Sequence, residues 1–246
     1  MRDEELVEAF DTLKKYENEE EFINEFITLL QDIFYSRTTF VKNSDNDEKR
    51  NEFFEEVKRK FIEAYISYKE TNEDNSNIFD IIKYIGCGHS SLAFKIGDIV
   101  IKVSKKRYES NPDKLKDLTG LIPVIYHSDT EIDKWEHYSI QVTPYVEIAK
   151  NLNDEDLYQV YKARRKQGYI WNDSTKDNIG IILKDFVYND IIYKKGDKVI
   201  VDLEDMTYVG EVTDEYAWDF ITYESYNKNT YNFETRYTKE LENIKK

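Results

Sequence analysis

Residues 1–85 contain neither glycine nor proline, and this absence constrains the fold more than any other feature of the sequence. Both residue types interrupt helices, so their absence favours long helical segments. Apolar residues recur there at spacings of three and four, as one buried helix face requires. The stripes are Leu6, Phe10 and Leu13; Phe22, Phe26, Leu29, Leu30 and Ile33; and Phe53, Val57, Phe61 and Tyr65. We expect about three amphipathic helices, which form either a cap packed on the next domain or a regulatory or substrate-recruiting module.

From Ile78 the pattern changes to short apolar runs separated by turns that contain glycine. The runs are residues 81–85, 92–96 and 99–103. They predict an antiparallel meander, in which Gly97-Asp98 is a typical hairpin turn. Gly86 and Gly88 lie at its first turn, where a backbone without side chains can approach phosphate oxygens closely.

The rest of the chain shows further strand and helix signals. We expect a short helix opening at Asn111-Pro112, strands over residues 121–127 and 138–142, a helix over residues 154–167, a hairpin turning at residues 194–197 and a helix over residues 216–226. Gly168 ends the helix predicted over residues 154–167 and is followed by a polar loop.

That loop holds Asp173 and Asn178, which are separated by four residues and followed at once by an apolar run. Asp202 closes a second apolar run, and Lys102 lies inside an earlier one. Carboxylate and amide oxygens suit magnesium, and a lysine places a positive charge against phosphates. A glycine turn after a strand, a lysine within a strand, D-x-x-x-x-N and an Asp ending a strand thus occur in this order.

This ordered set resembles the protein-kinase-like superfamily, in a compact, atypical form of the RIO-type or aminoglycoside-phosphotransferase-like kind. The resemblance covers roughly residues 78–210, about half of the chain. It implies an α+β, two-lobed fold: an N-terminal helical extension (residues 1–77), a β-rich N-lobe (78–147) and a reduced C-lobe (148–246). Mg-ATP would bind between the lobes.

The resemblance also implies which residues bind the nucleotide. Gly86, Gly88 and Lys102 would contact the phosphates of ATP. Tyr145 and Val146 stand where kinases have the hinge whose backbone reads adenine; an ordinary strand exit is the alternative. The carboxylate that pairs with Lys102 is open, between the N-terminal helices and residues 109–117.

Four residues would bind the metal and carry the chemistry. Asn178 and Asp202 would hold Mg²⁺, and Asp173, together with Lys102, would be catalytic. The implied function is an ATP- and Mg-dependent phosphotransferase acting on a hydroxyl of a protein or small molecule. A catalytically inactive, nucleotide-binding pseudokinase that serves as a regulatory partner is the main alternative. Transfer of AMP, and chance occurrence of the motifs in an acidic scaffold protein, also stay open.

Net charge and composition limit which classes of partner and which compartment are expected. The chain has 246 residues, with 35 Lys and Arg against 50 Asp and Glu, a net charge of −15. Such a surface repels nucleic acid and anionic lipid, so neither is expected as a partner. Cys87 is the only cysteine, which fits a reducing compartment. There is no apolar run of about 18 residues and no signal-peptide pattern, so we expect a cytoplasmic protein.

Overall fold

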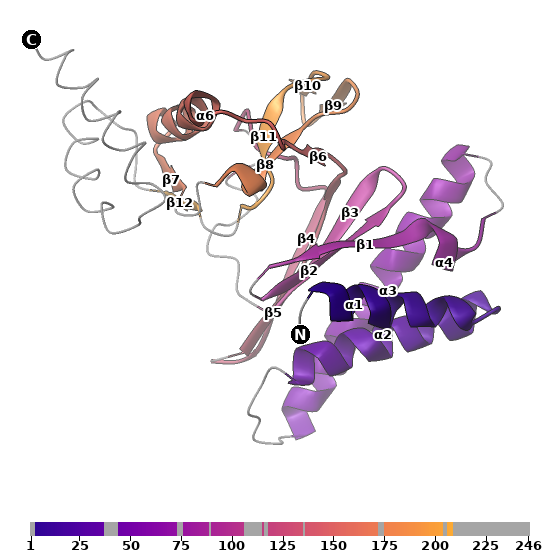
Figure 1. The fold of residues 1–246 in the computed structure, drawn as a ribbon. Coiled ribbons are helices and arrows are strands. Elements are labelled where there is room, and N and C mark those ends of the chain that lie inside the picture. Colours follow the sequence, from indigo (N-terminus) through magenta and orange to yellow (C-terminus); the bar gives the residue numbers. More distant parts are fainter. Residues whose placement is uncertain are drawn as a thin grey trace, which may run out of the picture. The chain divides into compact units, whose positions relative to one another are not determined.

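The computed structural model describes residues 3–36, 44–72, 76–88, 90–105, 115, 118–134, 136–171, 175–203 and 206–208. The chain forms two compact units. Unit 1 comprises residues 1–108 and 124–145, and unit 2 comprises residues 109–123 and 146–246. The described residues form an α+β structure with an antiparallel sheet and N-terminal helices, as the sequence predicts (Figure 1).

Unit 1 contains, in its described part, a five-stranded antiparallel sheet of order β1-β2-β3-β5-β4. Its strands are β1 (Ile82–Cys87), β2 (Ser91–Ile96), β3 (Ile99–Ser104), β4 (Tyr126–Asp133) and β5 (Glu136–Pro144). The predicted three-strand meander is therefore confirmed, and so is the strand over residues 138–142. The strand predicted over residues 121–127 is wrong, because β4 begins at Tyr126 and consists mostly of polar residues. Leu121 and Ile122 are instead buried in unit 2, where Leu121 forms an isolated parallel bridge with Ile200.

The helices of unit 1 match the predicted stripes. They are α1 (Asp3–Asp11), the 3₁₀ helix η1 (Thr12–Lys15), α2 (Glu19–Ser36), α3 (Ser44–Asn72) and the single turn α4 (Ile78–Ile81). The Asn18 side chain starts α2 by accepting hydrogen bonds from the backbone N–H groups of Glu20 and Glu21, at 2.8 and 3.2 Å. Such a cap satisfies donors that the first helical turn leaves without partners.

The helices and the sheet share one hydrophobic core. Phe94 of β2 lies at its centre, and its ring centroid is 5.0 Å from that of Phe10, 5.1 Å from Phe26 and 5.5 Å from Phe61. These rings come from α1, α2 and α3, so each main helix contributes to covering the same face of the sheet. The prediction that the helices dock on the β-meander is confirmed.

A buried ion pair joins α3 to β5. The Arg50 guanidinium donates from Nη2 to Glu136 Oε2 at 2.6 Å and from Nε to Oε1 at 3.2 Å. The two side chains are only 3% and 5% exposed. Tyr138 donates its hydroxyl to Glu136 Oε1 at 2.7 Å, and Lys105 Nζ lies 4.0 Å from the same oxygen. The hydrogen bond from Arg50 to Glu136 raises the pKa of the guanidinium further above its usual value.

Unit 2 is built from short strands around one described helix. Its elements are β6 (Glu147–Ile148), α6 (Asp154–Lys166), β7 (Tyr169–Trp171), η2 (Lys176–Asn178), β8 (Ile179–Ile181), β9 (Phe186–Tyr188), β10 (Ile191–Tyr193), β11 (Lys198–Ile200) and β12 (Met206–Tyr208). In the residues described, they pair as β11-β8-β6, β12-β7 and β10-β9. The helix predicted over residues 154–167 is confirmed, and Asn153 Oδ1 accepts the Asp156 N–H at 2.8 Å at its start.

One predicted turn of unit 2 is wrong. Residues 194–197 do turn, but they connect β10 to β11, which pairs with β8 and not with β10. The hairpin instead turns at Asn189 and Asp190, with φ of 48° and 64°. Asn and Asp tolerate this left-handed conformation better than most residues do, which is why they suit a tight hairpin.

Several predictions fall on residues outside the described ranges. They are Asp173, the helix opening at Asn111-Pro112 and the helix over residues 216–226. The division at residues 77 and 147 also stays a prediction. Among the described helices, none combines the length and apolar character that crossing a bilayer requires.

Candidate functional site

The glycine turn lies between β1 and β2 of unit 1. Gly86 has a φ of 155° at a bulge, where the pairing of β1 with β2 shifts register. Gly88 donates its N–H to the Ser91 carbonyl at 3.0 Å, and a Cβ at Gly88 would lie 2.7 Å from Ser91 Oγ. Gly86 is therefore required for its backbone conformation, and Gly88 for the close approach of Ser91.

Lys102 lies in the middle of β3, between Ala93 of β2 and Gln141 of β5. Its neighbours Ile101 and Val103 are completely buried in the core shared with the helices. Because side chains alternate along a strand, Lys102 belongs to the sheet face opposite that core. A central strand thus presents one positive charge on the face that the helices leave uncovered.

Tyr145 and Val146 lie where the chain passes from unit 1 to unit 2. The Tyr145 N–H donates to the Asp98 carbonyl at 2.7 Å, and Lys95 Nζ lies 3.5 Å from the centre of the Tyr145 ring. Val146 is buried against Gly180, where a Cβ would come within 2.2 Å of Val146 Cγ2. Both residues therefore have packing roles, and the Tyr145 amide is already used. Adenine recognition by this pair stays a prediction.

In unit 2 the structure brings Asn178 next to Asp202. Ile179 pairs with Ile200 across β8 and β11, and the Val201 N–H donates to the Asn178 carbonyl at 2.9 Å. Asn178 therefore lies beside the residue that precedes Asp202. β7, which precedes β8 in the chain, pairs with β12, which follows β11. The connection from β7 to β8 and the connection from β11 to β12 therefore both run from one of these strand pairs to the other.

Asn178 and Asp202 each carry an oxygen donor, and both residues are half-buried. Among the residues with described positions, no group of three or more His, Cys, Asp or Glu could hold a metal by itself. Mg²⁺ usually takes one or two protein carboxylates and completes its shell with phosphates and water. The donor chemistry therefore fits magnesium that arrives with a phosphate ligand better than a metal held by protein alone.

The sequence analysis missed Arg164, which connects α6 to the strands beside Asp202. Arg164 is 3% exposed and donates from Nη2 to the Thr119 carbonyl. The next residue, Gly120, accepts the Ile200 N–H at 3.0 Å. Burial lowers the pKa of Arg164 to about 10. Its place in the buried stripe with Leu157 and Tyr161, at helical spacing, is the signal that could have revealed it.

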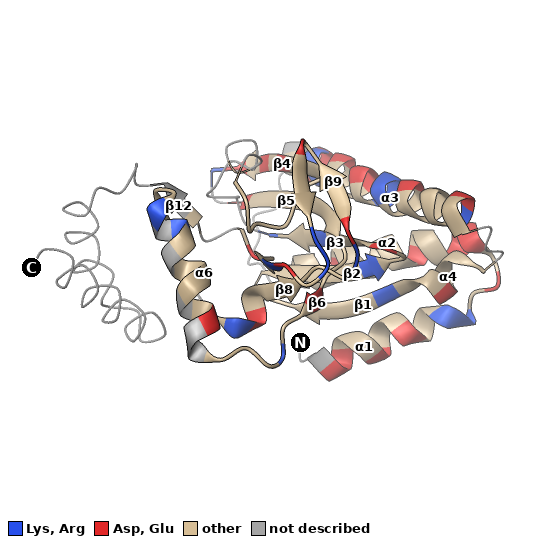
Figure 2. Cartoon of the chain, turned by 90° about the horizontal axis from the view of Figure 1, so that it is seen from above, with Lys and Arg blue, Asp and Glu red and all other residues tan. Residues whose placement is uncertain are grey.

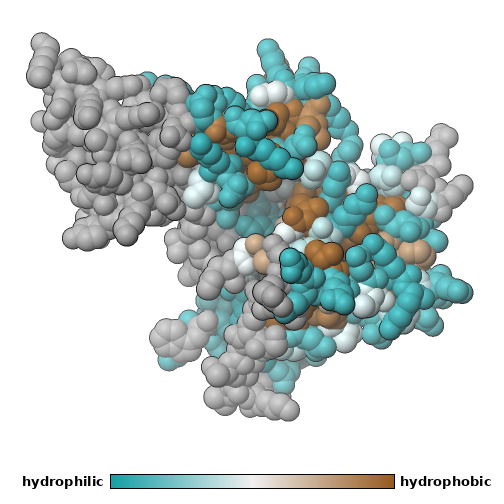
Figure 3. All heavy atoms as spheres, in the orientation of Figure 1, coloured by the Kyte–Doolittle hydropathy of each residue, from teal (hydrophilic) through white to brown (hydrophobic). Residues whose placement is uncertain are grey.

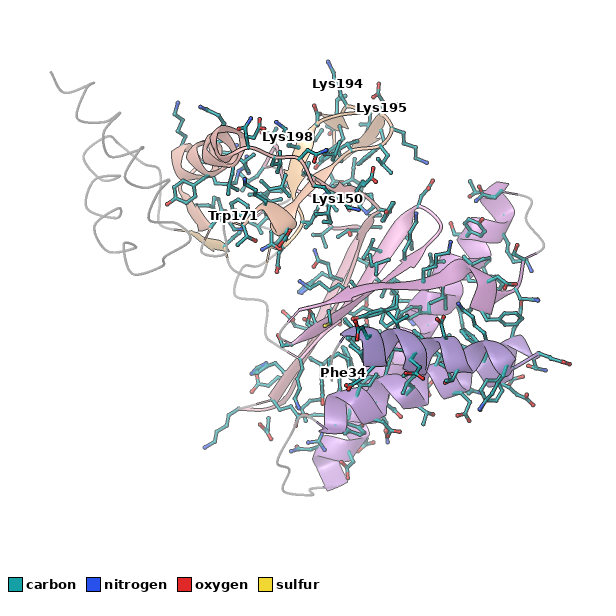
Figure 4. All side chains as sticks on the ribbon, viewed as in Figure 1. Phe34, Lys150, Trp171, Lys194, Lys195 and Lys198 are labelled. Carbon is teal, nitrogen blue, oxygen red and sulfur yellow. The ribbon has the colours of Figure 1, made fainter. Side chains whose placement is uncertain are left out.

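A second link between α6 and β11 is exposed to solvent. Lys198 Nζ lies 2.5 Å from Asp156 Oδ1, and this hydrogen bond lowers the pKa of the carboxyl group. Figure 4 labels Lys198 and also Trp171, the completely buried end of β7. The ion pair holds α6 against β11, the strand that leads to Asp202.

No protein-family model matches the chain, and no curated protein matches it. Fifty-five chains of solved structures do match. A 2.2 Å crystal structure of WbdD, a bifunctional kinase-methyltransferase, matches with a TM-score of 0.35 and 11% identity over 58% of this chain and 36% of the WbdD chain. WaaP in complex with acyl carrier protein matches with a TM-score of 0.36 and 12% identity over 66% of this chain and 80% of that chain.

The chain thus spans about a third of the length of the WbdD chain it matches. TM-scores of this size are too low to assign the chain to a family or to give it a function. The candidate site consequently depends on the geometry of its own residues.

Proposed function

We propose that this protein is a kinase-like phosphotransferase that uses ATP and Mg²⁺ to phosphorylate a hydroxyl group. The observation that carries the proposal is the hydrogen bond from the Val201 N–H to the Asn178 carbonyl. It brings an amide oxygen donor next to the segment of Asp202, although 24 positions separate the two residues in the sequence. Both are oxygen donors of the kind that binds magnesium.

Unit 1 supports the nucleotide half of the proposal. The Gly86–Gly88 turn has no side chain at two of its positions, so its backbone can approach phosphate oxygens closely, although the Gly88 N–H already donates to Ser91. Lys102 Nζ would bind the non-transferred phosphates as a point charge.

Unit 2 supports the metal and acceptor half. Asn178 Oδ1 and the Asp202 carboxylate would bind Mg²⁺, which neutralises charge on the phosphates when bound. Asp173, which precedes Asn178 by five positions, would accept the proton of the acceptor hydroxyl and orient its oxygen. Arg164 would act at a distance, by fixing the 119–120 turn against β11.

The proposal is tested by titrating Mg-ATP calorimetrically and following phosphate transfer from γ-labelled ATP. Asp202→Ala and Lys102→Met should weaken Mg-ATP binding together with turnover. Asp173→Ala should lower the rate by about 10²–10⁴ while ATP affinity stays nearly unchanged, the usual effect of losing a positioned base. Matched controls are Asp177→Ala, an exposed carboxylate beside Asn178, and Lys83→Met, an exposed lysine of β1.

The outcomes separate the candidate functions. Binding of Mg-ATP without any transfer would favour the nucleotide-binding pseudokinase. Transfer of label from α-labelled ATP, but not from γ-labelled ATP, would identify AMP transfer. If Mg-ATP does not bind, or if Asp202→Ala behaves like Asp177→Ala, the assignment of the site is wrong.

A further inference from the structure

A groove runs between α1 and β1 of unit 1, and its larger part reaches Gly86 of the glycine turn. It consists of two adjoining hollows of about 260 Å³ and about 550 Å³, which share Val7, Asp11 and Tyr84. β1 is the edge strand of the sheet, so the groove follows the side of the sheet that has no further strand among the described residues (Figure 1). We call it the α1–β1 groove.

The smaller hollow has an aromatic lining. Phe10, Phe26, Tyr84 and Phe94 contribute to it, and the Phe10 and Tyr84 rings stack with centroids 5.6 Å apart. At the rim of the larger hollow, Val7 and Ile85 are 45% and 46% exposed. Hydrophobic surface is visible on this face of the molecule in Figure 3. Exposed apolar surface beside a hollow with polar edges marks many interaction sites.

The size of the smaller hollow limits its occupant. Pockets for drug-sized small molecules occupy about 300–1,000 Å³ and enclose most of the ligand. A hollow of about 260 Å³ that opens into a wider groove suits one large side chain of a longer segment instead. Aromatic and other large side chains commonly anchor protein interfaces in this way.

The charged residues along the groove indicate the charge of the segment that would bind there. Glu4, Glu8 and Asp11 follow each other at spacings of four and three, so they lie on one side of α1, and all three line the larger hollow. Figure 2 shows the acidic positions along this helix. Two lysines, Lys14 and Lys83, line the smaller hollow, and Lys14 is paired with Asp11 at 2.5 Å. The larger hollow has no lysine or arginine in the described part of its lining, and Glu4 and Glu8 are its two remaining acids.

We propose that the α1–β1 groove binds a basic segment of a partner protein. One large apolar side chain of that segment occupies the smaller hollow, and lysines or arginines beside it face Glu4 and Glu8. This interaction surface goes beyond the proposed phosphate transfer, and it adjoins the glycine turn because Gly86 lines its larger hollow. Nucleic acid does not fit, because its phosphates would face the same carboxylates.

Fluorescein-labelled pentapeptides and the full chain test the proposal by fluorescence anisotropy. The main probe has a central tryptophan flanked by lysines. One analogue replaces the tryptophan by alanine, and the other replaces the lysines by glutamates. The main probe should bind, each analogue should bind about tenfold more weakly or less, and raised salt should weaken binding.

Variants locate the binding. Val7→Asp should weaken binding of the main probe about tenfold, and the double variant Glu4→Gln/Glu8→Gln should weaken it and reduce its salt dependence. Ile66→Asp removes a similarly exposed apolar residue of α3, and Glu48→Gln/Glu52→Gln removes an equally spaced acidic pair there; both controls should bind like the parent. All six positions are exposed, so melting temperatures should change little in any variant.

Three results would overturn the proposal. The first is no binding of the main probe at millimolar concentration. The second is equal binding of the glutamate analogue, which would show that the hollow accepts aromatic groups whatever their charge. The third is equal binding by the groove variants and the α3 controls, which would show that the probe binds through general electrostatics.

Discussion

Replacing Glu136 by leucine would leave the Arg50 guanidinium buried without the carboxylate that faces it. Arg50 is 3% exposed and Glu136 is 5% exposed, and two hydrogen bonds of 2.6 and 3.2 Å join them. Removing one partner of such a pair costs about 3–5 kcal/mol, because the other charge stays buried without compensation. For a chain of this size that corresponds to a fall in melting temperature of about 6–20 °C.

The single variants Arg50→Met and Glu136→Leu should lose different amounts of stability, because different partners remain for the residue that is left. In Arg50→Met, the Glu136 carboxylate keeps the Tyr138 hydroxyl at 2.7 Å and Lys105 Nζ at 4.0 Å. In Glu136→Leu, the guanidinium keeps Asp47 at 2.6 Å, but Asp47 is 57% exposed and compensates a buried charge less well than the buried Glu136 does. We therefore expect Arg50→Met near the lower end of the range and Glu136→Leu near the upper end.

The double variant Arg50→Met/Glu136→Leu separates the pair from its surroundings. It should recover most of the loss, because apolar side chains of similar volume often replace a buried ion pair at little cost. About 1 kcal/mol should remain lost, since the Tyr138 hydroxyl no longer has its acceptor. Urea unfolding followed by circular dichroism measures all three variants. Arg59→Met is the control, because its pair with Glu63 is 57% and 49% exposed and should contribute about 0.5 kcal/mol. If Glu136→Leu costs no more than Arg59→Met, or if the single losses simply add in the double variant, the reasoning is refuted.

Three further predictions follow from packing and titration. A truncated chain that starts at Ser76 should be insoluble or strongly destabilised, because the sheet loses the helices that cover its core; a soluble product with unchanged melting temperature in a thermal-shift assay would contradict this. Gly180→Ala should cost about 1–3 kcal/mol in urea unfolding through its contact with Val146, and adding Val146→Ala should restore part of the loss; equal stability of the single variant would mean that no contact limits this position. Burial and the hydrogen bond to Glu136 raise the pKa of Tyr138 above its usual value of about 10, so its contribution to stability is fully present below that pH and is lost as pH rises. Melting temperatures measured from pH 8 to pH 11 should therefore fall less steeply in Tyr138→Phe, and identical slopes would show that this hydroxyl does not carry the effect.

Much of unit 1 could be predicted because the spacing of apolar residues in its helices indicates directly which face is buried. Residues such as Phe26 and Phe61 recur at helical spacing and are buried as that spacing requires. The same reasoning failed at residues 121–127, because an apolar run indicates burial and not strand pairing. Leu121 and Ile122 are buried beside β11, whereas β4 is an edge strand whose polar residues are held by pairing with β5.

The candidate site was predictable in part for a related reason. Asn178 and Asp202 each adjoin an apolar run, and pairing of the two runs brings the residues together. Arg50 and Arg164 were missed because charged residues within an apolar stripe are usually assigned to solvent. Their acceptors lie 86 and 45 positions away in the sequence, so the helical spacing of Arg164 with Leu157 and Tyr161 could indicate its burial, but no local pattern reveals either acceptor.

Neither unit is formed by one continuous stretch of chain, and this affects how the protein can fold as it is synthesised. β5 pairs with both β3 and β4. The backbone groups on one edge of β3 therefore stay unpaired until Pro144 has been synthesised, 40 positions after Ser104. At 5–20 residues per second this takes about 2–8 s, during which an apolar strand edge is open to other chains. The bridge of Leu121 forms after a longer interval, because its partner Ile200 is synthesised 79 positions later. A nascent chain of this protein should therefore depend on chaperones most strongly between the completion of β3 and that of β5, and slower translation across residues 105–144 should increase aggregation.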